Sequence, residues 1–373
     1  MLFFATLKHK MWFMRKFLAL LFALVSVSAF GQQTENIIII TTDGLRWQEL
    51  FKGVDPELAS DKRFNQDDSA LIYTTYWAQD VAERRSKLMP FFWKTIAQQG
   101  QIHGNRELGS KVNVSNSYWF SYPGYNEIFS GYADQRIDAN DYPPNPNTTV
   151  LEFLNQQPSF KGKVAAFGAW EAFNRILNEQ RSGIPVVAAY DTTGGATPTA
   201  EEKLINSMLL SSHRMWAEEC FDVFTHHAAM QYLKKEKPRV LYIAYGETDE
   251  WAHGWKYRSY LQAATQVDKW IEEIWNYVQS TPQYRNKTTL LITTDHGRGD
   301  KNKRQWTSHG SDIEGADEIW FAVMGPNTPA LGEIKQPSQF YQKQFAQTIA
   351  KLLGLTFTAN QPIAEEISEV IKR

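Results

Sequence analysis

The sequence predicts an α/β protein with a doubly wound, mostly parallel central sheet that carries helices on both faces. Two observations lead to this class. Short runs rich in β-branched residues alternate with longer amphipathic stretches along the 373-residue chain. In addition, the apolar runs are hydrophobic at consecutive positions, which is typical of strands that are covered on both faces.

The strands are expected where these apolar runs occur, and each is bounded by residues that favour turns. The six predicted strands are 37–42, 163–168, 184–189, 240–245, 289–294 and 319–324. Helical periodicity is clearest in four stretches, at 91–99, 204–216, 257–278 and 341–353. Gly100, Pro282 and Gly354 supply stop signals after three of these helices.

The N-terminal segment, residues 1–31, has the composition of a secretory signal. It contains four basic residues and no acid, and an apolar run from 17 to 30 follows them. A retained membrane anchor is the alternative, although the run is shorter than the roughly 20 residues needed to span a bilayer. We therefore expect a periplasmic or secreted protein with no stable membrane span after cleavage.

Composition excludes several other classes. The chain carries 39 Lys and Arg against 41 Asp and Glu, so no strong field would attract nucleic acid. Cys220 is the only cysteine, which rules out an intramolecular disulfide and a cysteine-based metal site. Residues 32–373 are expected to form a single catalytic domain with inserted loops, one of which is the stretch 132–149, rich in Asp, Asn and Pro.

Three of the predicted strands lead into acidic residues, which are Asp43, Asp249 and Asp295. In an open parallel sheet, ligands bind beyond the carboxyl ends of the strands, so these acids should converge on one site. An isolated acid at such a position would be interpreted as a helix N-cap. Three such acids, two of them with a histidine nearby, indicate a single functional site.

Histidines accompany these acids at informative spacings. Asp249 and His253 are four residues apart and share a face if the chain turns helical there. His296 directly follows Asp295, and His309 lies in the next loop. Mixed Asp and His ligands suit Zn²⁺ or Mn²⁺ better than Ca²⁺, with Zn²⁺ as the first choice and Mn²⁺ as the alternative. The six ligands form two sets of three, so we expect two divalent ions.

These residues resemble the alkaline phosphatase superfamily, which includes phosphatases, nucleotide pyrophosphatase/phosphodiesterases, sulfatases and cofactor-independent phosphoglycerate mutases. The resemblance extends from Asp43 to His309. It implies an alkaline phosphatase-like fold and two metal sites. The first site would comprise Asp43, Ser121, Asp295 and His296, and the second would comprise Asp249, His253 and His309.

Ser121 takes the position of the nucleophile in this resemblance. The segment Ser-Tyr-Pro-Gly at 121–124 is similar to the diesterase motif in which Thr precedes Phe-Pro-Asn, so Gly124 stands where the diesterases have Asn. Asn126 is the candidate substitute for that amide. Pro123 indicates a helix that begins just after Ser121, whose N-terminus would favour a phosphate.

Further substrate contacts are expected from residues beside the ligands and after the strand 163–168. They are Arg46, Trp170, Arg175 and Arg298. Each has a plain structural alternative as a solvated or ion-paired residue. Sulfatase activity is disfavoured because Tyr125 replaces the Arg of the sulfatase motif, and the export signal disfavours a mutase.

The resulting expectation is a secreted two-metal hydrolase of small phosphate esters, with monoesters slightly preferred over diesters. The metals would lower the pKa of the Ser121 hydroxyl and stabilise the departing oxygen. A phosphodiesterase or nucleotide pyrophosphatase is the alternative within the family. A metal-dependent binding module without catalysis is the alternative outside it.

Overall fold

Five parallel strands form the centre of the main sheet in the computed structural model, which describes residues 33–372. The predicted signal segment, 1–31, lies outside the described residues. Within the described part, eight strands follow the order β10-β2-β9-β7-β1-β6-β4-β5, and a second sheet has the order β11-β3-β8. The strands are β1 (Asn36–Thr42), β2 (Gln101–His103), β3 (Ser110–Asn113), β4 (Val164–Gly168), β5 (Val186–Ala188), β6 (Val240–Tyr245), β7 (Thr288–Thr293), β8 (Glu318–Ile319), β9 (Phe321–Met324), β10 (Gly332–Glu333) and β11 (Ser338–Tyr341).

Strand β1 lies in the middle of this sheet, paired in parallel with β6 on one side and with β7 on the other. Beyond β6 the parallel pairing continues through β4 to β5. Beyond β7 the next strand, β9, is antiparallel. The predicted fold class is therefore confirmed, with one antiparallel strand inserted toward the β10 edge.

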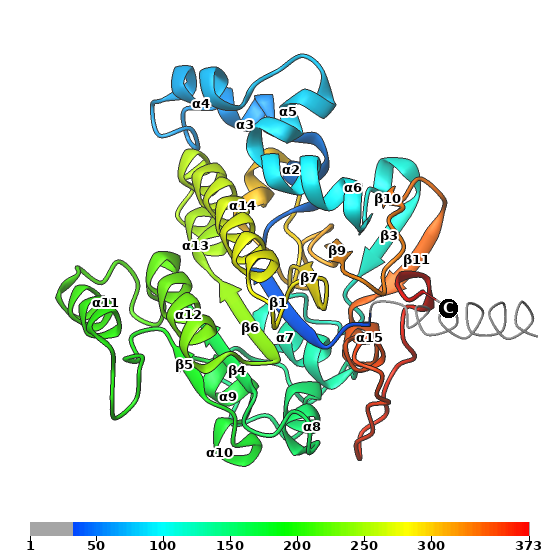
Figure 1. Cartoon of the computed structure of the whole chain (residues 1–373). Helices are drawn as coiled ribbons and strands as arrows, with labels where there is room; N and C mark the ends of the chain where they lie inside the picture. Colours follow the sequence, from blue (N-terminus) through cyan, green and yellow to red (C-terminus); the bar gives the residue numbers. More distant parts are fainter. Residues whose placement is uncertain (1–32, 373) are drawn as a thin grey trace, which may run out of the picture. The chain divides into compact units, whose positions relative to one another are not determined.

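Helices cover both faces of the sheet (Figure 1). Successive side chains of β1 point to opposite faces of the sheet. Ile38 and Ile40 pack with the layer that contains α14, and Ile37 and Ile39 pack with the layer that contains α7 and α15. The α-helices are α2 (Trp47–Lys52), α3 (Pro56–Ser60), α4 (Ser69–Tyr76), α5 (Val81–Leu88), α6 (Ala97–Gln99), α7 (Ser121–Ser130), α8 (Val150–Gln156), α9 (Phe173–Ile176), α10 (Glu179–Ser182), α11 (Ala200–Ser211), α12 (Asp222–Glu236), α13 (Glu247–His253), α14 (Tyr257–Ser280) and α15 (Phe345–Leu352). Short π or 3₁₀ turns are η1 (Phe92–Ile96), η2 (Arg106–Leu108), η3 (Lys303–Thr307), η4 (Gln342–Gln344) and η5 (Ser368–Val370).

Most predicted elements occur within a few residues of their expected bounds, and the differences have local causes. Helix α11 begins and ends earlier than the predicted 204–216, because Thr199 and Glu202 form a capping box that sets its start. The predicted helix 91–99 contains the π-helical turn η1. The predicted strand 319–324 is divided between β8 and β9, which belong to different sheets.

The loop between α7 and α8, residues 131–149, contains no helix or strand, as its composition predicted. From Thr34 onward the chain forms one compact unit. No helix among the described residues combines the length and the apolar content required to cross a membrane.

Candidate metal centre

The carboxyl ends of β1, β6 and β7 bring the predicted acids together at one edge of the sheet. Asp43 follows β1 directly, Asp295 lies two residues beyond the end of β7, and Asp249 lies in α13, the helix that follows β6. All three side chains are buried. Because β1 pairs with both neighbouring strands in parallel, the convergence follows from the register of the sheet.

Asp43, Asp295 and His296 form the first group of converging ligand atoms. The Nε2 atom of His296 lies 3.3 Å from Asp43 Oδ1 and 3.4 Å from Asp295 Oδ2. These two carboxylate oxygens are buried and accept no hydrogen bond within the described chain. The other oxygen of each acid is held by the protein: Tyr125 donates to Asp43 Oδ2 at 2.9 Å, and the amide of Gly44 donates to Asp295 Oδ1 at 3.1 Å.

His296 is oriented by its own loop. Its Nδ1 lies 2.9 Å from the carbonyl oxygen of Gly297, so Nδ1 carries the donated hydrogen and Nε2 faces the acids. Burial opposes protonation of this ring, but the charges of Asp295, Asp43 and Asp249 together raise its pKa to about 9. Without a bound cation, the positive charge of the His296 imidazolium therefore offsets part of the negative charge of these three acids.

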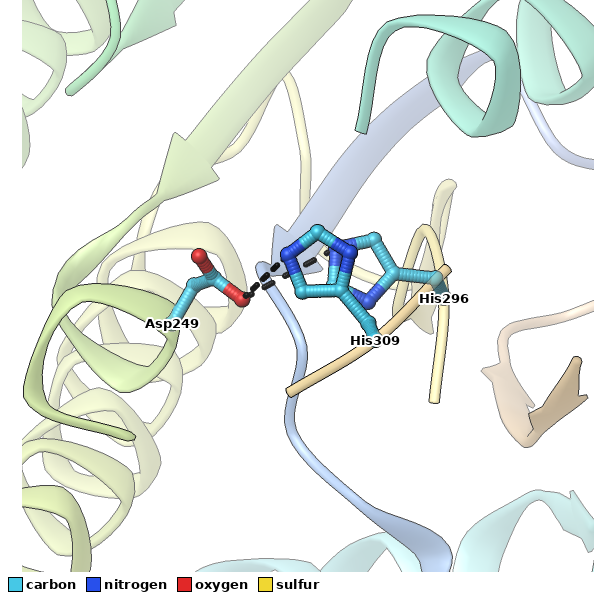
Figure 2. A group of neighbouring side chains, drawn as sticks. All are labelled: Asp249, His296 and His309. Carbon is cyan, nitrogen blue, oxygen red and sulfur yellow. Dashed lines mark ion pairs between the residues drawn. The ribbon is translucent and has the colours of Figure 1, made fainter. Parts of the chain in front are cut away.

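Asp249, His296 and His309 form the second group (Figure 2). The Oδ1 atom of Asp249 lies 3.8 Å from His296 Nε2 and 3.7 Å from His309 Nε2. The two imidazole rings stack with centroids 4.0 Å apart. His296 thus lies between the two groups, whereas the sequence had assigned it to the first group alone.

His253 completes the neighbourhood of Asp249, as the four-residue spacing on α13 predicted. Its Nε2 lies 3.0 Å from Asp249 Oδ2 and 2.9 Å from His309 Nε2. His253 therefore contacts both Asp249 and His309, although the group of converging ligand atoms around Asp249 contains His296 and His309 and not His253. Burial disfavours the charge on Asp249, yet Arg298, His253 and His309 together hold the pKa of Asp249 well below its ordinary range.

Ser121 is the first residue of α7 and faces the first group. Its hydroxyl oxygen lies 3.3 Å from His296 Nε2, and the side chain is 6% exposed. The preceding Trp119 has a φ of 54°, a left-handed conformation that is costly for a bulky residue. Its carbonyl oxygen accepts the Gly310 amide at 3.0 Å, which ties the segment before Ser121 to the loop that carries His309.

Asn126 and Arg46 do not reach this site, which corrects two of the predicted substrate contacts. The Asn126 amide is buried in α7, where it donates to Tyr132 O and accepts from Asn145 and Asn147, so it holds the following loop instead. Arg46 is buried against Glu49 and also donates to the carbonyl oxygen of Gly299.

Arg298 does lie at the centre, but its donors are already engaged. Its guanidinium contacts the Asp249 carboxylate and donates to the carbonyl oxygens of Trp306 at 2.6 Å and Thr307 at 2.8 Å. This arrangement braces the loop that leads to His309. Arg298 therefore has no free pair of N–H groups for the phosphate contact that the sequence predicted.

Trp170 and Arg175 lie in the segment that follows β4. Trp170 is 7% exposed, and Arg175 donates to the carbonyl oxygen of Asn140 at 3.3 Å while pairing with Glu171 at 3.5 Å. Asn140 was missed by the sequence reasoning. Its side-chain oxygen accepts the amide of Tyr122, the second residue of α7, at 3.0 Å, so it is adjacent to Ser121. Only the three-dimensional path of the loop brings it there, although Asn is a common capping residue.

The donor atoms fit divalent cations. Asp43 Oδ1 and Asp295 Oδ2 are buried carboxylate oxygens with no partner in the described chain, and they face the same imidazole nitrogen. Burial, and then the charge of a neighbouring acid, raises the pKa of Asp43 and raises that of Asp295 well above its ordinary value. Carboxylates that repel one another in this way favour a bound cation, and mixed carboxylate and imidazole donors suit a divalent transition metal.

Comparison with known proteins assigns a family to this geometry. Residues 51–351 match the family model described as type I phosphodiesterase / nucleotide pyrophosphatase. No curated protein matches the sequence.

Solved structures share the fold at low sequence identity. The alkaline phosphatase PafA superposes with a TM-score of 0.58 and 11% identity, over 91% of this chain and 99% of its own. A 2-O GAG sulfatase has a TM-score of 0.54 and 14% identity, over 91% of this chain and 74% of its own. The lipoteichoic acid synthase LtaP from Listeria monocytogenes has a TM-score of 0.53 and 12% identity, over 91% of this chain and 76% of its own.

Proposed function

Because the chain belongs to the type I phosphodiesterase / nucleotide pyrophosphatase family, we propose that it is a two-metal hydrolase of phosphate esters with Ser121 as its nucleophile. The observation that carries the proposal is the placement of the Ser121 hydroxyl, 3.3 Å from the imidazole that both candidate metal groups share. We further propose that residues 32–373 act as one catalytic domain and that the protein works in the periplasm or outside the cell.

Seven residues would hold the ions and the nucleophile. Asp43, Asp295, His296 and Ser121 would form one site, and Asp249, His253 and His309 would form the other. When bound, Zn²⁺ or Mn²⁺ would lower the pKa of the Ser121 hydroxyl and offset the charge on the departing oxygen.

The chain's own groups would perform the remaining work. Ser121 Oγ would form a bond to phosphorus as the ester oxygen departs as an alcohol, and water would later break the phosphoserine bond to release phosphate. The α7 N-terminus would receive the phosphoryl oxygens, together with Asn140 and Arg175, because Asn140 contacts the amide next to Ser121 and Arg175 contacts Asn140. Trp170 would contact the alcohol portion of the substrate.

Monoesters are the first candidate substrates, because the Ser-Tyr-Pro-Gly segment departs from the diesterase motif. Phosphodiesters are the second candidate, favoured by the description of the matched family. A sulfatase role is not proposed. Tyr125, which stands where the sulfatase motif has Arg, donates its hydroxyl to Asp43 and so serves a candidate metal ligand.

The test compares nitrophenyl phosphate with bis-nitrophenyl phosphate, after chelation and after restoring Zn²⁺ or Mn²⁺. Wild type should turn over the monoester faster, and Ser121→Ala should lose at least about 10³-fold in kcat. Ser117→Ala is the matched control, because its exposed hydroxyl contacts Gln135 and not the centre. Faster diester turnover would establish the second candidate. Full activity of Ser121→Ala, or metal-independent turnover, would refute the proposal.

A further inference from the structure

Two helices beside the metal centre cap each other's N-termini. Helix α12 begins at Asp222 and helix α13 begins at Glu247. The residues before them, Phe221 and Gly246, have no side-chain acceptor that could serve as a cap. Instead, Asp222 accepts the amides of Gly246 at 2.7 Å and of Glu247 at 3.1 Å, and Glu247 accepts the amide of Asp222 at 2.9 Å. The starts of the two helices are therefore joined by a reciprocal contact.

Asp222 holds the start of α13 with both of its oxygens. Its Oδ1 accepts the Gly246 amide and its Oδ2 accepts the Glu247 amide, so one side chain satisfies two consecutive donors that the helix itself leaves without an acceptor. Asp222 is 1% exposed, so water does not replace these contacts easily. An amide or hydroxyl side chain would present a single oxygen to the two donors. The carboxyl group is therefore the side-chain type that fits this position.

Packing on this side of α13 is incomplete, which gives the hydrogen bonds more weight. A cavity of about 240 Å³ lies between α12, α13 and α14, and its lining includes Asp222, Glu247, Trp251 and Trp270. Side chains of α14 thus leave part of the first turn of α13 uncovered. The Trp251 indole donates to Glu247 Oε2 at 2.9 Å, which fixes the Glu247 carboxylate at the start of α12. Polar contacts, and not close packing, hold the helix start here.

The first turn of α13 leads directly to candidate metal ligands. Asp249 is the third residue of this helix and His253 is its last. A second contact ties the same turn to the first group, because Thr248 donates its hydroxyl to the carbonyl oxygen of Asp43. The start of α13 is therefore held both by Asp222 and by the backbone of Asp43.

We propose that Asp222 is a positioning residue for the second metal group, because it fixes the start of the helix that presents Asp249 and His253. The inference rests on the proposed two-metal function, since it concerns the placement of ligands for the second ion. Asp222 acts through two backbone amides and not through a ligand atom. Its loss should shift the start of α13 and weaken the ion at Asp249, while the ion at Asp43 and Asp295 stays bound.

The chain supplies a matched control in Asp268 of α14. This acid is also buried, and its two oxygens accept the consecutive amides of Phe91 and Phe92, both at 2.8 Å. The turn that it holds, at the start of η1, carries none of the candidate ligands. Asp222→Asn and Asp268→Asn therefore make the same chemical change, because in each variant an NH₂ group must face one of two amides. Both should lower Tm.

The test titrates chelated protein with Co²⁺ and follows the visible absorption of the bound ion. Wild type should bind two ions, and Asp249→Asn and Asp295→Asn identify the binding step that belongs to each group. Asp222→Asn should weaken the Asp249 step by at least about tenfold, as expected when a group that orients a ligand is lost, and should leave the Asp295 step unchanged. Asp268→Asn should bind both ions as wild type does. Asp222→Ser, which also presents a single oxygen, should show the same selective loss and replaces the Asn variant if that variant does not fold.

The selectivity of the loss separates positioning from charge and from general instability. Removal of the Asp222 charge alone would weaken both steps, because Asp43 of the first group is among the acids that raise the pKa of Asp222. Equal weakening of both steps, wild-type binding by the Asp222 variants, or the same loss in Asp268→Asn would overturn the inference. A single bound ion in wild type would refute the two-metal proposal and the inference together. Two bound ions without hydrolysis of any ester, with the selective loss in Asp222→Asn, would refute the hydrolytic function and support the positioning role.

Discussion

Helix α7 approaches the backbone of Asp295 so closely that a Cβ on Gly124 would lie 2.5 Å from the Asp295 carbonyl oxygen. Helix α7, which begins at Ser121, and the Asp295–His296 segment are therefore packed directly against one another. This contact accounts for the glycine in the Ser-Tyr-Pro-Gly segment, since a larger residue there would separate Ser121 from His296.

Gly124→Ala should therefore impair activity more than it impairs folding. The added methyl must push α7 away from Asp295, and misplacing the nucleophile by about 1 Å costs on the order of 100-fold in rate. Overpacking should also lower the free energy of unfolding by about 1–3 kcal/mol. Kinetics of nitrophenyl phosphate hydrolysis and a thermal unfolding curve would measure both effects.

Gly162→Ala is the control for this substitution. A Cβ at Gly162 has nothing within 4 Å, but its φ of 70° makes the backbone unfavourable for alanine. This variant should lose stability and keep its rate. Equal rates for Gly124→Ala and wild type would show that the helix can move without consequence for the nucleophile.

Metal should stabilise the folded protein against heat. Asp43 Oδ1 and Asp295 Oδ2 accept no hydrogen bond within the described chain and would both bind a cation directly, and ligand at 100 times its dissociation constant adds about 2.7 kcal/mol. Addition of Zn²⁺ to chelator-treated protein should raise Tm by several degrees. Asp295→Asn should raise the Tm of the chelated protein, because it relieves repulsion, and should abolish the response to Zn²⁺. An unchanged response in this variant would exclude Asp295 as a ligand.

Tyr125→Phe tests the group that orients Asp43. Removal of the phenol leaves Asp43 Oδ2 without the 2.9 Å hydrogen bond that fixes the carboxylate. Loss of such an orienting partner typically weakens metal binding by about 10–100-fold. Titration of the chelated variant with Zn²⁺ would measure this change. Tyr122→Phe is the control on the same helix, because its hydroxyl donates to Pro143 O.

Stability should fall in mild acid because of His103. Burial lowers the pKa of this imidazole to about 4, below its ordinary 6.5, so the unfolded chain binds a proton more readily than the folded one. The stability that His103 contributes is fully present above pH 6.5 and is lost as pH falls toward 4. At pH 5 the loss amounts to about 2 kcal/mol. His103→Phe, which can keep the stacking on Phe321, should reduce the dependence of Tm on pH between 7 and 5, and the remainder includes His226, whose pKa burial also lowers to about 4. Substitution of the exposed His213 should leave that dependence unchanged.

The sequence predicted the sheet centre and the three acids well because each depends on local pattern. Apolar runs such as the one ending at Thr42 can only be strands covered on both sides, and the end of such a strand leads directly to Asp43. Short edge strands such as β10, with two residues, carry too little pattern to be recognised.

Contacts at the site were harder to predict than its ligands. Arg46 and Asn126 have the chemistry of phosphate binders, yet Glu49 accepts from Arg46 and the carbonyl oxygen of Tyr132 accepts from the Asn126 side-chain amide. Asn140 reaches the start of α7 through a long loop, whose path depends on packing and not on a repeating pattern. Periodicity and acid–histidine spacing therefore find candidate ligands, and they miss polar contacts that depend on the path of a loop.

Glu127 holds the loop in front of Ser121, the proposed nucleophile. Its buried carboxylate accepts hydrogen bonds from the amides of Ser115 and Asn116 at 2.8 Å, and from the Lys343 amide at 3.0 Å. The Asn116 side chain in turn accepts the amides of Tyr118 and Trp119, which fixes the left-handed turn before Ser121.

Glu127→Gln replaces an acceptor of these amides with an NH₂ group that faces them. The change should cost about 1–3 kcal/mol of stability through unsatisfied donors. The loosened turn should lower kcat about tenfold or more while KM changes little, because Ser121 and not the phosphate pocket is displaced. Glu152→Gln is the control. It removes a half-buried ion pair between Glu152 of α8 and Arg181 of α10, so it should lower Tm and leave kcat unchanged. If both variants lost stability and neither lost kcat, Glu127 would support the fold without positioning the nucleophile.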